Sequence, residues 1–181
     1  MRTLVLYTSK TGNTQKYAED LASAVKADVL PFKKFKKKMI DSYDCIVYGG
    51  YVMGEKIQGI DEFLRHYELM KEKEVIIFSC GMSFVTKETR AHMIDANILD
   101  LYHVRYYQLR GSFDFNKLGP VQKFLMNHSL KMIANSEDAS PDQRALLTLK
   151  ETPLTYYDQA GIDRMVSVIN KIAAEKDIIV Q

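Results

Sequence analysis

The stretch that decides the fold reads Thr8-Ser9-Lys10-Thr11-Gly12-Asn13-Thr14. It follows a strand-forming apolar run at residues 3–7, and residues 17–25 after it carry apolar side chains at helical spacing. Such a strand–turn–helix junction leaves backbone N–H groups free at the start of the helix, and hydroxyl side chains add further donors. No acidic residue occurs before Glu19. The stretch therefore predicts a binding site for an anion, in particular a phosphate group.

The kind of phosphate follows from the motifs that the stretch does not contain. A nucleoside triphosphate loop reads G-x-x-x-x-G-K-[ST] and a dinucleotide loop reads G-x-G-x-x-G, and neither is present here. One glycine among short hydroxyl side chains suits a single terminal phosphomonoester, because Gly12 lets the backbone come close. The alternative is an ordinary helix start, in which Ser, Thr and Asn are common capping residues.

This stretch resembles the phosphate loop of flavodoxins, [ST]-x-[ST]-G-[NH]-[ST], and matches it position for position directly after an N-terminal strand. The resemblance covers about residues 1–110 and 156–176. It implies that the chain binds the phosphate of FMN as cofactor, through Thr8, Ser9, Lys10, Thr11, Gly12, Asn13 and Thr14. It also implies a flavodoxin-like fold.

The order of apolar patterns along the chain points to the same fold. Further strands are expected at residues 28–32, 43–50, 74–80 and 104–110, and further helices at residues 57–72, 86–99 and 161–175. Alternating strands and helices are typical of a parallel sheet that helices cover on both faces. We predict an α/β fold with a doubly wound sheet of five parallel strands in the order 2-1-3-4-5, and residues 1–181 in a single domain. Flavodoxin is the standard example of this order, with FMN at its switch point.

In this strand order, the loops after the first, third and fourth strands meet at one edge of the sheet. The two later loops supply the remaining expected contacts: Gly50, Tyr51, Val52, Met53, Gly54, Cys80, Gly81, Met82, Ser83 and Phe84. Tyr51, Met53, Met82 and Phe84 are candidate walls for a flat ring, although such residues also pack in ordinary cores. Met53-Gly54-Glu55 resembles the Met-Gly-Asp turn of short flavodoxins, which implies a peptide that can flip toward the reduced flavin.

Residues 112–151 form an insertion between the last strand and the closing helix. Helical spacing predicts a helix at residues 120–134, followed by a polar loop at 136–143. The insertion resembles that of menaquinone-dependent protoporphyrinogen dehydrogenases, which are flavodoxin-like enzymes of similar length. That resemblance implies a quinone as electron acceptor. The amphipathic helix is expected to cover a substrate or to contact a membrane, since long insertions in compact domains are often functional.

Composition limits the partners and the compartment. The formal net charge is only +2, which does not argue for nucleic acid, and it departs from the strongly acidic character of shuttle flavodoxins. No apolar run approaches a membrane span and no signal peptide is recognisable, so we expect a cytoplasmic protein. The lysine-rich run at residues 33–38 is either a solvated loop or a contact with the anionic inner face of a membrane. Cys45 and Cys80 are expected to be buried free thiols.

No catalytic or metal-binding constellation emerges from the sequence. The four histidines are scattered without metal-ligand spacing, and no nucleophile motif is present. The chemistry is therefore expected to come from the flavin. Two functions follow: an FMN protein that transfers electrons with a redox partner protein, or a quinone-dependent FMN oxidoreductase that acts on a small organic substrate.

Overall fold

The structure is a computed structural model that describes residues 1–139, 143–144, 146–150 and 152–179. The strands are β1 (Thr3–Thr8), β2 (Asp28–Pro31), β3 (Cys45–Met53), β4 (Lys56–Ile57), β5 (Glu74–Gly81) and β6 (Arg105–Arg110). The α-helices are α1 (Asn13–Val25), α2 (Ile60–Leu64), α3 (Lys87–Ala96), α4 (Pro120–Ala134) and α6 (Gln159–Ile179). Short 3-10 helices lie between them: η1 (Phe32–Lys34), η2 (Lys37–Ser42), η3 (Tyr67–Leu69), η4 (Leu99–Leu101), η5 (Phe115–Lys117) and η6 (Leu146–Lys150).

The sheet has the order β2-β1-β3-β5-β6, and all of these neighbours pair in parallel. Counted along the chain, the five parallel strands follow the predicted order 2-1-3-4-5, which is confirmed. The two-residue strand β4 was not predicted. It pairs antiparallel with the end of β3, with Met53 opposite Lys56 and Val52 opposite Ile57.

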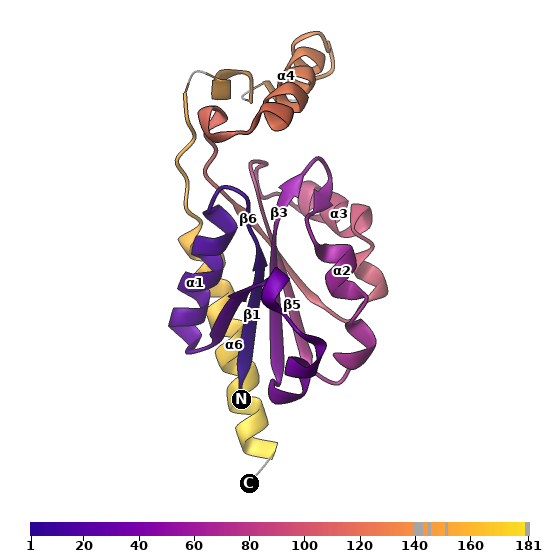
Figure 1. The fold of residues 1–181 in the computed structure, drawn as a ribbon, viewed down its shortest axis with the longest axis vertical. Helices are drawn as coiled ribbons and strands as arrows, with labels where there is room; N and C mark the ends of the chain where they lie inside the picture. Colours follow the sequence, from indigo (N-terminus) through magenta and orange to yellow (C-terminus); the bar gives the residue numbers. More distant parts are fainter. Residues whose placement is uncertain (140–142, 145, 151, 180–181) are drawn as a thin grey trace.

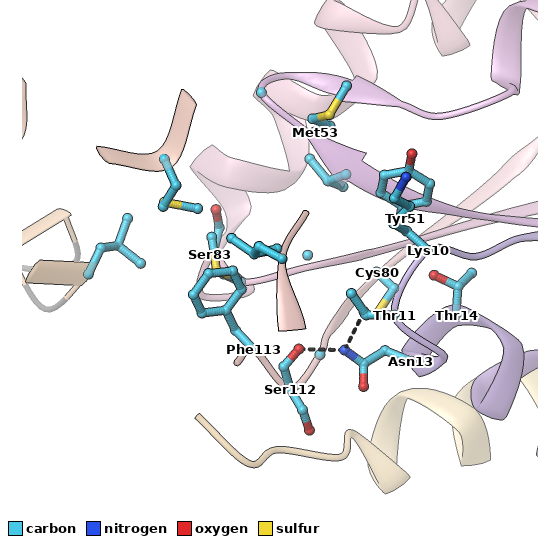
Figure 2. A pocket seen from close by; sticks show the side chains of 18 of the residues that line it. Lys10, Thr11, Asn13, Thr14, Tyr51, Met53, Cys80, Ser83, Ser112 and Phe113 are labelled. Atoms are coloured by element: carbon cyan, nitrogen blue, oxygen red, sulfur yellow. Dashed lines mark hydrogen bonds between the residues drawn. The ribbon is translucent and has the colours of Figure 1, made fainter. Parts of the chain in front are cut away.

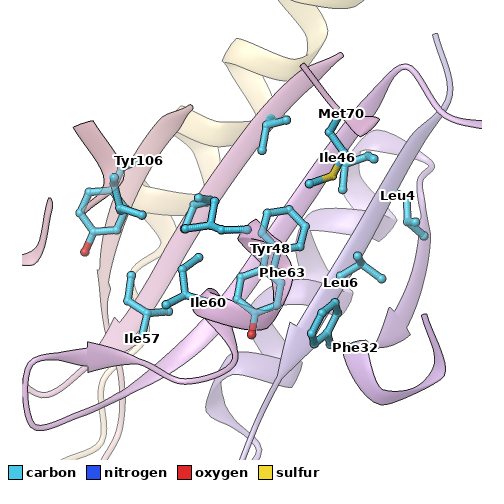
Figure 3. Packing of buried hydrophobic residues seen from close by; sticks show 14 of the residues in the cluster. Leu4, Leu6, Phe32, Ile46, Tyr48, Ile57, Ile60, Phe63, Met70 and Tyr106 are labelled. Carbon is cyan, nitrogen blue, oxygen red and sulfur yellow. The ribbon is translucent and has the colours of Figure 1, made fainter. Parts of the chain in front are cut away.

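Helices cover both faces of the sheet (Figure 1). Successive strand residues point to opposite faces, so Leu4 and Leu6 pack with α2 and α3, while Val5 packs with α1 and α6. In the first of these layers the ring of Tyr48 stacks on Phe63, with ring centroids 4.7 Å apart (Figure 3). Both sides of the central strands are buried, which explains their continuous apolar sequence.

The helix predicted at residues 57–72 was too long. Residue 57 belongs to β4, and Gly59, with φ of 82°, precedes the short helix α2. The chain then turns through η3 instead of continuing as an α-helix. Periodicity alone overlooked this because residues 57–59 close a hairpin against β3, an interaction between separate segments of the chain. Similarly, the helix predicted at 86–99 ends at Ala96.

The insertion leaves and rejoins the body of the protein at one narrow root. Phe113 and Leu154 form an antiparallel bridge in which each N–H donates to the other carbonyl at 2.8 Å. Below the bridge, the Tyr17 hydroxyl donates to the Arg110 carbonyl (2.5 Å) and accepts from the Asp158 N–H (2.6 Å). The root is therefore fixed to α1. The predicted helix at 120–134 is present as α4, whereas η6 was not predicted; residues 140–142 of the predicted loop lie outside the described residues.

Both cysteines are free and buried, as predicted. Within the part of the chain that the structure describes, no helix has the length and apolar character needed to cross a membrane.

Candidate functional site

A cavity of about 250 Å³ lies at the carboxyl edge of the sheet, between the strand ends and the insertion (Figure 2). The loops after β1, β3, β5 and β6 form one side, as the strand order requires. Their lining residues are Lys10, Thr11, Asn13, Thr14, Tyr51, Val52, Met53, Gly54, Cys80, Gly81, Met82, Ser83, Gly111, Ser112 and Phe113. The insertion forms the other side with Leu118, Leu125, Met126, Ser129 and Leu146. Twelve of the lining residues were predicted from the sequence, from Lys10 to Ser83.

The start of α1 has free hydrogen-bond donors and no acidic side chain in its first turn. Gly12 is its N-cap residue with φ of 92°, no side chain caps the helix, and its first turn contains no acid. Only three buried side-chain polar atoms among the described residues have no hydrogen-bond partner: Ser9 Oγ, Thr14 Oγ1 and Asn127 Oδ1. Two of them belong to residues 8–14. Because buried polar groups are nearly always paired, these hydroxyls and the free helix N–H groups fit a bound anion. An ordinary capped helix start is not what forms here.

Cys80 lies beside this anion site and adds no negative charge to it. Its thiol lies next to the Thr14 hydroxyl, which lowers the pKa of the thiol, but less than burial raises it. Burial raises the pKa of the Cys80 thiol to about 12, so the group stays neutral near pH 7. No Asp or Glu lines the described cavity, and Lys10 is its one charged lining residue. The electrostatics therefore favour a ligand with a negative end.

Two residues predicted as phosphate ligands hold neighbouring parts of the chain instead. The Thr8 hydroxyl lies 2.9 Å from the Tyr48 hydroxyl, beneath the loop, and Thr8 does not line the cavity. The Asn13 side-chain amide donates to the Ser112 carbonyl and lies 3.4 Å from Thr11 Oγ1. Asn13 thereby links the start of α1 to the root of the insertion (Figure 2).

Met53 and Gly54, in the turn between β3 and β4, line the cavity. This turn is held in place by the buried side chain of Asn97, the C-cap residue of α3. Gly54 has φ of 64°, as a two-residue hairpin turn requires. Asn97 is only 1% exposed; its Oδ1 accepts from the Ile57 N–H, and its Nδ2 donates to the Glu55 and Met93 carbonyls, each at 2.9 Å. Asn97 was not predicted, because a single Asn inside the helix expected at residues 86–99 gives no signal for this role.

The loop after β5 places Met82 and Ser83 at the cavity but not Phe84. Phe84 is 38% exposed, and the Arg110 guanidinium lies over its ring, 3.9 Å from the centroid. Arg110 Nε also donates to the Met82 carbonyl at 3.2 Å. Of the other predicted contacts, Ser9, Gly12 and Gly50 do not line the cavity either. Ser9 and Gly12 belong to the anion site at the start of α1, and Gly50 is buried in β3.

The insertion supplies one wall of the cavity, through residues that were not singled out from the sequence. Phe113, at the root, lies on the side of the cavity away from Tyr51 (Figure 2). Leu118, Leu125 and Met126 add further apolar side chains. A mainly apolar cavity next to an anion site is compatible with a ring that carries a phosphate group. Among the described residues, no group of His, Cys, Asp and Glu is arranged to hold a metal ion.

This geometry defines an α/β protein with a cavity at the switch point of its parallel sheet, next to a helix start that has free donors and no acid. The family model of the flavodoxin domain matches residues 4–140, and the chain belongs to that family. The resemblance seen in the sequence is confirmed at this level. The likeness of the insertion to that of protoporphyrinogen dehydrogenases stays a prediction.

The individual proteins to which the chain is similar share less than 30% of its sequence. The chain is 27% identical over 115 residues to an uncharacterized protein of Methanocaldococcus jannaschii, covering 62% of this chain and 73% of that protein. It is similar in structure to two-electron reduced flavodoxin of Megasphaera elsdenii (TM-score 0.45, 18% identity, 80% of this chain and 94% of that chain). It is also similar to a flavoprotein of Lactobacillus acidophilus in complex with FMN (TM-score 0.40, 18% identity, 60% and 91%).

Proposed function

We propose that this chain binds FMN and takes part in electron transfer through the bound flavin. The observation that carries the proposal is the pair of buried, unpartnered hydroxyls, Ser9 Oγ and Thr14 Oγ1, at an uncapped helix start without acids. A phosphomonoester supplies several acceptor oxygens and negative charge to this point. Membership of the flavodoxin domain family supports the same ligand.

In this proposal, one set of residues binds the phosphate of FMN and another set encloses its ring. The first N–H groups of α1 with Ser9 and Thr14 would hold the phosphate, and the apolar part of the cavity would hold the ring. FMN supplies hydride and one-electron chemistry when bound. The protein contributes exclusion of water by Tyr51, Phe113 and the insertion. Because no carboxylate lines the described cavity, no like charge opposes an added electron there.

Titration of the flavin-free protein with FMN and with riboflavin tests this proposal. The two ligands share the ring system and differ in the phosphate group. We expect FMN to bind with a Kd at or below about 1 μM and riboflavin to bind at least about a hundredfold more weakly, since charge-assisted contacts to the phosphate are lost. Flavin fluorescence quenching measures both affinities. Equal affinities, or no FMN binding at micromolar concentration, would contradict the proposal.

The insertion favours a second candidate, in which a quinone or another small organic molecule accepts the electrons. Leu118, Leu125 and Met126 give the cavity an apolar wall next to the expected ring position. In a protein that only passes electrons to a partner protein, these side chains would enclose the flavin ring and would not touch the acceptor. The quinone-dependent oxidoreductase thus differs from a carrier in one testable respect, which is direct contact between α4 and the acceptor.

Two methionines of α4 separate these candidates. Met126 lines the cavity, whereas Met132 is 62% exposed and does not. If a quinone enters the cavity, Met126→Gln slows anaerobic reoxidation of the reduced FMN protein by a short-chain quinone about tenfold, because a polar amide replaces apolar contact. Met132→Gln leaves the rate unchanged. Equal rates for both variants in stopped-flow absorbance would assign the acceptor role to a partner protein.

A further inference from the structure

Helix α4 carries a row of exposed apolar side chains. Val121 and Phe124 are each 72% exposed, Met132 is 62% exposed and Leu125 is 49% exposed. Their spacing places them on one side of the helix, and Leu130 on the opposite side is buried at 6% exposure. We call these four residues the outer row of α4. Scattered surface apolar residues are normal, but these four share one side of the helix, where only His128 lies between Leu125 and Met132, and such a cluster indicates an interaction surface.

The charged residues within α4 and just before it are lysines, and acidic residues flank this segment at Asp114, Glu137 and Asp138. Residues 115–136 contain Lys117, Lys123 and Lys131, one histidine, and no Asp or Glu. Lys131 is exposed, and the Lys117 side chain is 72% exposed, 3.9 Å from Asp114. Apolar side chains together with lysines on one helix are characteristic of helices that lie in the interface of an anionic bilayer. The lysines meet the lipid headgroups while the apolar side chains enter the acyl boundary.

The position of α4 makes this surface accessible. The helix lies beyond the carboxyl edge of the sheet, at the opposite end of the molecule from both termini (Figure 1). Its 15 residues span about 22 Å, enough to rest along a surface. Leu125 belongs both to the outer row and to the cavity lining. The apolar surface therefore continues into the mouth of the cavity.

We propose that α4 docks the protein on a membrane rich in anionic lipids, with its outer row in the headgroup–acyl boundary. A second copy of this chain is a poorer occupant of the same face, because pairing two such helices brings their lysines together. The lysine-rich run at residues 33–38 is charged like α4 but has no exposed apolar side chains beside it. Within residues 32–42 no large apolar side chain is exposed, so that run has charge alone.

Vesicle co-sedimentation of the full chain tests the docking. The vesicles contain phosphatidylcholine with or without about one third phosphatidylglycerol. We expect binding to the anionic vesicles that weakens with added salt. Combined Val121→Ser and Phe124→Ser lowers this affinity at least about tenfold through lost apolar burial, and Lys131→Gln lowers it about fivefold. Leu101→Ser is the matched control, because Leu101 in η4 is also 72% exposed, and it leaves binding unchanged.

Several outcomes would overturn the proposal. These are absence of binding to anionic vesicles, equal binding to neutral vesicles, or binding that survives the Val121 and Phe124 changes but is lost on Lys34→Gln. Sedimentation velocity without vesicles provides a further check. A concentration-dependent dimer that Phe124→Ser abolishes would assign the outer row to self-association instead. Circular dichroism and thermal unfolding of each variant establish that the fold is intact.

Discussion

Gly12→Asp is expected to abolish FMN binding while leaving the protein folded. The substitution places a carboxylate at the N-cap of α1, beside the N–H groups that would hold the phosphate. An added Cβ meets no atom within 4 Å, so the side chain has space. Repulsion between the carboxylate and a phosphate a few ångströms away, together with competition for the same donors, weakens binding by at least about a hundredfold.

Gly12→Asn is the control for this prediction. Asn has nearly the same shape, carries no charge and tolerates a positive φ about as well as Asp does. Both variants share whatever strain comes from the φ of 92° at this position. We therefore expect Gly12→Asn to retain most of the FMN affinity, within about tenfold of the unmodified chain. Comparable losses in the two variants, measured by fluorescence titration, would show that backbone shape rather than charge controls the site.

Asn97→Ala should cause the largest loss of stability among single changes near the site. The substitution removes three hydrogen bonds and leaves the buried N–H of Ile57 and the buried Met93 carbonyl without partners. At about 1–3 kcal/mol for each buried group left unpaired, we expect the free energy of unfolding to fall by about 3 kcal/mol. Urea denaturation measures this change. Hydrogen exchange at Ile57 should accelerate as well, because the hairpin that carries Met53 and Gly54 is released.

His92→Ala is a control on the same helix and the same hairpin. His92 Nε2 lies 3.0 Å from Glu55 Oε1, but both side chains are more than half exposed. Such surface contacts contribute little, so this variant should lose less than about 0.5 kcal/mol. If the two variants lost the same stability, the buried amide of Asn97 would not be what holds the hairpin.

The fold could be predicted from the sequence because its signals are local. Composition and residue spacing are enough to predict the strand at residues 3–7, the turn at 8–14 and the helix after it. The strand order then follows from the alternation of strands and helices and from the flavodoxin resemblance. Strand β4 and the shortened helix α2 depend on pairing with β3, a contact that no pattern within residues 57–72 reveals.

Position in the sheet correctly predicted which loops meet at the cavity, whereas the hydrogen-bond partners of individual side chains could not be predicted. Thr14 and Tyr51 reach the cavity because parallel strands end at one edge. Thr8 matches the loop motif, yet its hydroxyl contacts Tyr48, which the motif does not include. Asn97 and Leu146 come from elements that the sequence could not place near the site. Their contribution depends on tertiary packing.

The narrow root of the insertion bears on how flavodoxin-domain proteins acquire different insertions. Because Phe113 and Leu154 are bonded to each other, the chain between them is a closed loop whose ends the body has already brought together. The entropy of closing a loop grows only with the logarithm of its length, so segments of very different size can be exchanged at this junction at nearly constant thermodynamic cost. Insertions of different length and sequence can therefore be exchanged here while the flavodoxin-domain sheet stays unaltered.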